Sequence, residues 1–142
     1  MRQLVAMACL GWMAAPFAAP AAHAQAVGAF DGAWNVTIVC ANAFDGAAGY
    51  TLNFVAQVRG GAIDGRYSNP RTDAAALLSG RIQPDGAALL KVDGTTGRVE
   101  YSVGRVQPGT PYHYTANARF SGRSGAGTRN ELRRCDLSFS RS

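Results

Sequence analysis

The segment Gly32–Cys40 constrains the fold of this chain more than any other. Its residues alternate, with Trp34, Val36, Ile38 and Cys40 on one face and mostly polar residues on the other. A period of two with many β-branched residues is typical of a half-buried β-strand. We therefore predict that this segment is the first strand of the folded domain.

The residues before this strand have the pattern of an export signal. A basic residue is followed by an apolar stretch from Leu4 to Phe17, and Ala22-His23-Ala24 has the small-x-small form of a cleavage site. The apolar stretch is too short to span a bilayer well, and this order of features is typical of a secretory signal peptide. We predict a signal peptide over residues 1–24, cleavage near Ala24–Gln25, and a single domain over residues 25–142 that is periplasmic or secreted.

Two cysteines, Cys40 and Cys135, remain after the predicted cleavage. An even pair in an exported chain predicts a disulfide. It would close a loop of about 95 residues, for which the chain-entropy model gives about 4–5 kcal/mol. A thiol nucleophile would need a base, and His113 is the one histidine after residue 24. A lipid anchor on Cys9 is disfavoured, because only five apolar residues precede it.

Strand patterns continue to the end of the chain, and turn signals follow each of them. No segment after the first strand has a convincing helical period, and short alternating runs separated by turns are typical of an all-β sandwich or barrel. We predict seven further strands at residues 50–58, 62–68, 75–82, 87–92, 98–106, 112–120 and 128–139. Eight strands with short connections favour an antiparallel up-and-down barrel, because closure removes both exposed edges. The predicted disulfide would then join the first and last strands. A two-sheet β-sandwich is the alternative.

The start of the first strand, Gly32-Ala33-Trp34, resembles the Gly-x-Trp start of lipocalin and avidin-like barrels, the calycins. The resemblance implies that Trp34 lies across a closed end of the barrel, with an arginine of the last strand over it. If Cys40 and Cys135 lie opposite each other on antiparallel strands, Arg141 falls opposite Trp34 on the same face. A cation–π contact there would contribute about 0.5–2 kcal/mol. The resemblance covers this start and the C-terminal arginine.

The direction of the first strand assigns the connections to the two ends of the barrel. The turns at Gly60, Pro84 and Pro108 belong to the closed end. The connections assigned to the open end cover residues 42–49, 69–73, 94–97 and 121–127. They are longer and rich in glycine, which suits the mouth of a binding site.

Charged residues of the predicted last strand lie on the face that we expect to turn inward. They are Arg129, Glu131 and Arg133. A buried arginine needs a partner, which is either a carboxylate such as Glu131 or Asp45 or an anionic ligand. A β-bulge at Arg133 would instead turn the charges to solvent. The candidate ligand-binding residues, including three tyrosines expected inside the mouth, are Tyr50, Tyr67, Tyr101, Arg129 and Arg133.

The sequence has no pattern that indicates catalysis or metal binding. HxxxH, CxxC and Gly-x-Ser-x-Gly patterns are absent, and aspartates such as Asp31, Asp45 and Asp64 precede glycine, as in turns. The glycine-serine segment 121–127 lacks the Gly-Lys-Ser/Thr ending of a phosphate loop. We expect no cofactor and no metal. The net charge of +5 suits an anionic partner without specifying nucleic acid.

We predict a non-catalytic, monomeric exported barrel that binds a small or extended ligand, with an anion as one option, at its open end. Its partner would be a small ligand or an envelope component, with no transmembrane segment. Two alternatives are an interaction module (an inhibitor or accessory subunit) that uses its loops and basic C-terminal hairpin, and a small cofactor-free enzyme. An empty interior lined by Tyr50, Tyr67 and Arg129 would favour ligand binding. An interior filled by side chains such as Leu90 and Phe120 would favour the interaction module.

Overall fold

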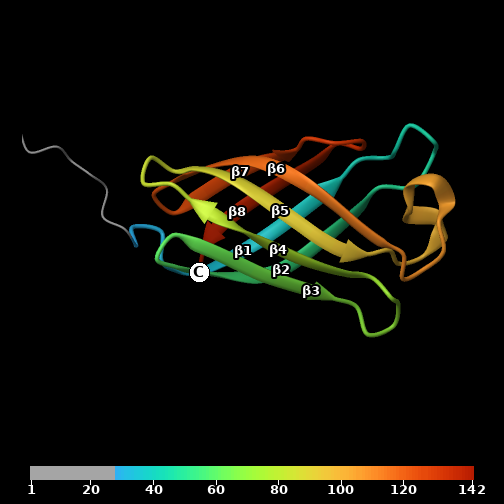
Figure 1. Ribbon diagram of the computed structural model, residues 1–142, viewed down its shortest axis with the longest axis horizontal. Coiled ribbons are helices and arrows are strands. Elements are labelled where there is room, and N and C mark those ends of the chain that lie inside the picture. The colour runs from blue at the N-terminus through green and yellow to red at the C-terminus, as the bar shows by residue number, and fades with distance from the viewer. Residues whose placement is uncertain (1–27) are drawn as a thin grey trace, which may run out of the picture.

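The structure, a computed structural model, describes residues 28–142, so the predicted signal peptide, its cleavage site and Cys9 lie outside the described residues. The described chain forms eight antiparallel strands, and the last pairs with the first to close a barrel (Figure 1). The strands are β1 (Gly32–Cys40), β2 (Tyr50–Arg59), β3 (Ala62–Ser68), β4 (Ala75–Ile82), β5 (Ala87–Thr95), β6 (Pro111–Ser121), β7 (Ser124–Arg129) and β8 (Cys135–Arg141). The predicted all-β up-and-down barrel is confirmed. The sandwich alternative is wrong.

Strand β1 follows its alternating sequence residue for residue. Trp34, Val36, Ile38 and Cys40 are at most 2 % exposed and point into the barrel. Burial of this apolar face removes it from water, which is the main favourable contribution to folding. The prediction for this segment is confirmed in both its bounds and its buried face.

The closure between β1 and β8 has the predicted register. Cys40 lies opposite Cys135 and forms the disulfide, and Trp34 lies opposite Arg141. The guanidinium carbon of Arg141 is 5.1 Å from the centre of the Trp34 ring. This geometric prediction is confirmed.

The predicted strand over residues 98–106 is wrong. This segment instead forms two short turns of 3-10 helix, η1 (Val99–Tyr101) and η2 (Val103–Arg105). Gly104 and Arg105 have φ angles of 74° and 51°, in the left-handed region, which an extended strand does not contain. The alternation of Val99, Tyr101 and Val103 therefore does not reflect a sheet.

The predicted last strand over residues 128–139 and the predicted loop over residues 121–127 are also wrong. The chain leaves the sheet between β7 and β8, where Leu132 has a φ of 58°, and residues 124–129 form strand β7. Gly125 and Gly127 fit within β7 because a Cβ atom at either position would lie 2.8 Å from the Phe120 ring or the Ala118 Cβ. Their glycines make room for side chains of β6 rather than making a loop. The count of eight strands holds because one predicted strand disappears and another divides.

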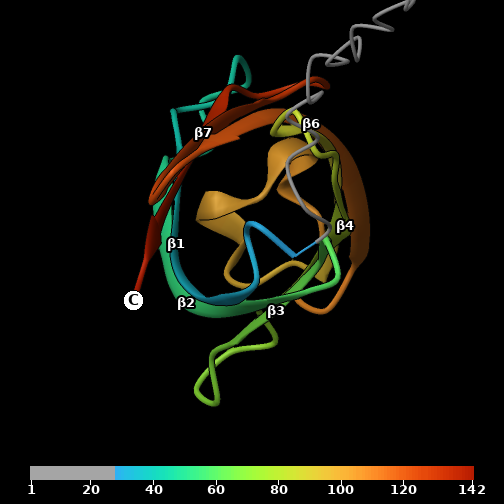
Figure 2. The ribbon, with the colours of Figure 1, turned by 90° about the vertical axis from the view of Figure 1, so that its left-hand side faces the viewer.

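Because of these two differences, two connections lie at the opposite ends of the barrel from those predicted. The turn at Gly122 between β6 and β7 lies at the closed end, and the Pro108 turn lies at the open end. The open-end segments are residues 41–49, 69–74, 96–110 and 130–134. In Figure 1 these segments gather at the right, with the orange turns η1 and η2 among them, and Figure 2 shows the strands as a closed ring seen from the opposite end.

The half of the barrel towards the closed end is filled with side chains. Phe120 contacts Trp34 edge-on at 5.3 Å between ring centres, and it also packs against Phe30 and Phe139. The indole nitrogen of Trp34 donates a hydrogen bond to the carbonyl oxygen of Phe30 at 2.8 Å. The segment before β1 therefore seals this end. Over the described residues, no helix has the length and apolar character needed to cross a membrane.

Candidate functional site

A cavity of about 700 Å³ opens at the end of the barrel opposite Trp34. We call it the cup. It is lined by the open-end parts of β2, β3, β4, β5, β6 and β7 and by the segments 69–74, 96–110 and 130–134. Its volume lies in the range of small-molecule sites, about 300–1,000 Å³.

The cup has a one-sided charge. Its lining includes four arginines, Arg71, Arg98, Arg129 and Arg133, together with His113, and no aspartate or glutamate among the described residues. Arg98 lies 3.9 Å from the carboxylate of Glu100, and both side chains are largely exposed. A concave surface with one sign of charge raises the local concentration of counter-ions. The charged side chains that line the cup are therefore all basic.

Arg129, at the end of β7, has no carboxylate partner within residues 28–142. Its guanidinium carbon lies 4.1 Å from the centre of the Tyr114 ring, and its Nη1 is 3.9 Å from the Cys135 sulfur. Its Nε is buried and has no hydrogen-bond partner among the described residues. Its Nη2 group makes no hydrogen bond to the described residues, so this group is available to a ligand in the cup.

Arg133 is held by backbone carbonyls from two other segments. It is 4 % exposed, and it donates to the carbonyl oxygens of Tyr101, Ala47 and Ala48 at 3.0, 3.0 and 3.1 Å. It thereby joins the segment 130–134 to the segments 41–49 and 96–110. Because Arg133 points inward, the predicted outward bulge at this residue is wrong.

Asp45 holds the same two segments together from outside the cup. Its carboxylate accepts hydrogen bonds from the backbone N–H groups of Gly104, at 2.6 Å, and Ala47, at 3.1 Å. These bonds, that of Gly104 first, hold the pKa of the carboxyl below its ordinary value of 3.8. Asp45 therefore does not neutralise Arg133, and that alternative from the sequence is wrong.

Glu131 does not point inward either, which corrects the prediction from its parity. It is exposed, and it accepts hydrogen bonds from the hydroxyl and the N–H of Thr115 at 2.6 and 2.8 Å. These bonds, that of the hydroxyl first, lower the pKa of Glu131. The left-handed backbone at Leu132 changes the direction of the chain, so residues 131 and 133 no longer share a face.

Two parallel tyrosines form one wall beneath and beside Arg129. The rings of Tyr112 and Tyr114 are 6.2 Å apart between centres and 5° from parallel. Tyr112 lines the cup, and Tyr114 lies buried below it. Burial is the largest cause of a raised pKa at both phenols, so each is a neutral hydroxyl at neutral pH.

All five candidate ligand-binding residues predicted from the sequence line the cup. They are Tyr50, Tyr67, Tyr101, Arg129 and Arg133. Tyr101 reaches it from η1 and not from a strand, and Arg133 reaches it from a loop. Sequence reasoning did not single out Tyr112, Arg71 or Arg98, although all three line the cup. The alternation of β6 placed Tyr112 inward, but nothing in it indicated how far the filled core extends.

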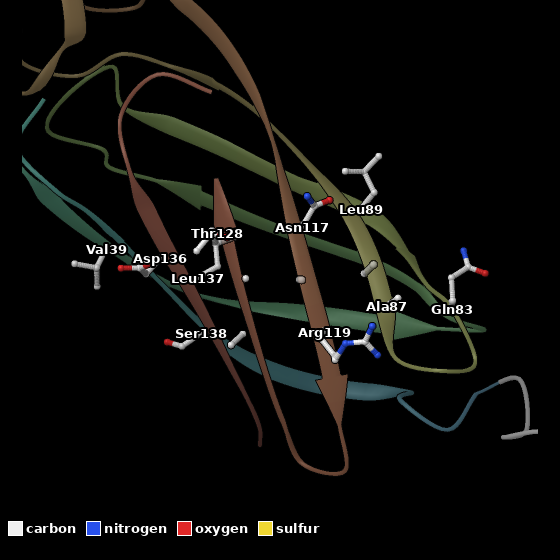
Figure 3. A pocket seen from close by; sticks show the side chains of 14 residues that line it. Val39, Gln83, Ala87, Leu89, Asn117, Arg119, Thr128, Asp136, Leu137 and Ser138 are labelled. Atoms are coloured by element: carbon white, nitrogen blue, oxygen red, sulfur yellow. The ribbon is translucent and has the colours of Figure 1, made fainter. Parts of the chain in front are cut away.

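A second hollow, of about 960 Å³, lies on the outer wall of the barrel (Figure 3). Side chains of five neighbouring strands, such as Val39, Leu89, Asn117, Thr128 and Asp136, surround it. Figure 3 shows these side chains spread across the sheet, without convergence on one point. The cup, which is inside the barrel mouth and ringed by arginines and tyrosines, is the better candidate site.

Comparison of the chain with protein-family models, curated proteins and solved structures found no match. The geometry of the cup is therefore the main guide to the function of this protein. Within residues 28–142 no three histidine, cysteine, aspartate or glutamate side chains are grouped as metal ligands.

Proposed function

We propose that this protein is an exported, non-catalytic barrel that binds a small anionic molecule in the cup. The observation that supports this most directly is the lining of the cup, which has four arginines and no carboxylate among the described residues. An unpaired guanidinium in a half-enclosed cavity is costly unless an anion binds to it. Arg129 is the residue best placed for this role, because it lines the cup and forms no ion pair within the described residues.

A filled interior would favour a protein-interaction role and a hollow interior would favour ligand binding, and this barrel has one half of each kind. Leu90 and Phe120 fill the closed half, and Tyr50, Tyr67 and Arg129 line a hollow open half. The filled half supplies the core that keeps the strand ends in place. The hollow half supports ligand binding, on a rigid scaffold whose loops surround the site.

Native mass spectrometry of the protein purified from its source tests the proposal. We expect a bound small molecule that is released as an anion. Val106 is half-buried in the cup lining, so the larger side chain of Val106→Trp should fill the cup and prevent the small molecule from binding. Val55→Trp places the same side chain on the outer wall of β2, where Val55 is 52 % exposed, and should leave binding intact. Source-purified protein without a ligand that also fails to bind any anion would contradict the proposal.

One observation favours the second candidate function, an interaction module. Phe44 and Leu132, both in open-end segments, are 83 % and 74 % exposed. Large apolar side chains exposed at one end of a molecule are typical of protein-interaction sites when they form a patch. If this function is correct, the variant Phe44→Ser, which lies outside the cup lining, should lose a co-purifying partner protein and keep any small molecule in the cup.

A further inference from the structure

The filled half of the barrel limits the length of a ligand. Below the cup, Ile38, Leu78 and Leu90 are completely buried, and Trp34 and Phe120 close the far end. Protein interiors packed in this way leave no channel for a long chain. A ligand that enters the cup therefore stops at the layer of Tyr112 and Arg129.

The wall at this depth is aromatic. The ring of Tyr112 continues the parallel stack begun by Tyr114, and Tyr50 and Tyr67 add two more rings to the lining. Aromatic rings pack well against other planar groups in offset or edge-on arrangements, and each such pair contributes about 0.5–1.5 kcal/mol beyond its buried area. The phenol of Tyr112 is neutral, so its hydroxyl can donate a hydrogen bond to a ligand without repelling a negative charge.

Arg129 lies next to this wall, and the N–H donors of its guanidinium group lie in one plane. One face of its guanidinium is covered by the Tyr114 ring at 4.1 Å, so a partner reaches it in the guanidinium plane. A guanidinium approached in its plane matches the two oxygens of a carboxylate. Arg133 has most of its donors occupied by carbonyls and is less available.

Resting on the proposed function, we infer that the ligand is a compact aromatic carboxylate. Its carboxylate binds Arg129, and its ring lies against Tyr112. Long-chain acids are excluded because the barrel interior below the cup is filled.

Isothermal titration calorimetry of the mature protein with three probes tests this inference: 2-naphthoate, the uncharged 2-naphthalenemethanol, and dodecanoate. We expect 2-naphthoate to bind at least about tenfold more tightly than 2-naphthalenemethanol, which lacks the charged partner for Arg129. We also expect it to bind at least about tenfold more tightly than dodecanoate, because the filled interior below the cup leaves no room for the long chain. Arg129→Gln should weaken 2-naphthoate binding by about tenfold or more. Arg119→Gln removes the same charge from an exposed position on the outer wall of β6 and should leave the affinity unchanged.

The ring contact is tested separately. Tyr112→Phe keeps the ring and should retain most of the affinity, whereas Tyr112→Leu should weaken 2-naphthoate binding several-fold. Binding of 2-naphthoate that Arg129→Gln does not change, or that Arg119→Gln abolishes, would overturn the inference. Dodecanoate binding that depends on Arg129 and equals that of 2-naphthoate would overturn the aromatic class and leave the proposed function standing. If no carboxylate or other anion binds, both fail.

Discussion

The guanidinium of Arg141 lies over the indole of Trp34, with 5.1 Å between its carbon and the ring centre, and donates a hydrogen bond to the carbonyl oxygen of Ala29 at 2.9 Å. These two contacts tie the last residues of β8 to the segment that seals the closed end. The hydrogen bond joins two residues that are 112 positions apart in the chain. The closed end of the barrel is thus covered by the segment before β1, and the cup opens at the other end.

Replacing Arg141 should therefore loosen this cap. We expect Arg141→Ala to lower the free energy of unfolding by about 1–3 kcal/mol, from the loss of a cation–π contact and a charged hydrogen bond. The control is Arg123→Ala, because Arg123 is exposed in the neighbouring turn. Urea unfolding measures both variants. Equal stabilities for the two would show that the contact over Trp34 contributes little.

Arg133 and Arg134 form a matched pair for testing the loops around the cup. Arg133→Met should lower the free energy of unfolding by about 1–3 kcal/mol, because the carbonyl oxygens of Tyr101 and Ala48 lose a charged donor. The carbonyl oxygen of Ala47 keeps its hydrogen bond from the Ala43 amide. Arg134 is exposed, so Arg134→Met should change stability by less than about 0.5 kcal/mol.

Hydrogen exchange locates the effect of the Arg133 change. The Ala48 amide donates to the Glu100 carbonyl between two open-end segments, and it should exchange faster in Arg133→Met. An unchanged rate at Ala48 would contradict the role given to Arg133.

Asp45 should make the same region sensitive to acid. Because folding lowers the pKa of its carboxyl, the ionised form stabilises the contact above the ordinary value of 3.8, and the stabilisation is lost as the pH falls through the lower, folded value. The amide proton shift of Gly104, followed by NMR, should titrate with a midpoint below 3.8. Asp45→Asn should abolish this titration. A midpoint at or above 3.8 would contradict the hydrogen-bonded geometry.

The disulfide should contribute a large share of the stability. Cys40 and Cys135 are 95 residues apart in the chain, for which loop closure gives about 4–5 kcal/mol. We expect the double variant Cys40→Ala, Cys135→Ala to lose stability up to this amount, as measured by urea unfolding. Mass analysis of the mature protein under denaturing, non-reducing conditions should find no free thiol. Two free thiols would contradict the closure of the barrel by this bond.

The sequence predicts well the parts of the fold that depend on local alternation. Strand β1 and its register with β8 follow from a period of two and one pair of cysteines. The segment 98–106 alternates in the same way, yet its path depends on Gly104 and on a carboxylate 59 residues away in the chain. Strand β7 was not predicted because its glycines resemble a loop, and the sequence does not show that Gly125 makes room for Phe120 and Gly127 for Ala118.

The candidate site was predictable to the same extent. Tyr50 and Tyr67 lie on strands whose faces alternate regularly, so their position in the mouth follows from parity. The inward position of Arg133 depends on carbonyls 85 and 86 residues away, which no local pattern indicates. Glu131 turns outward because Leu132 takes a left-handed conformation, and leucine gives no sign of that in a sequence.

The central claim, that the cup is the binding site for an anion, is tested most directly by NMR titration of the ¹⁵N-labelled mature protein with 2-naphthoate. Binding in the cup should shift the amide signals of Tyr67, Gly97, Tyr112 and Arg129 in a saturable way. The amides of Leu89, Thr128 and Ser138, around the outer hollow, should not move. Shifts confined to the outer hollow, or no saturable shifts with this or any other anion, would contradict the account.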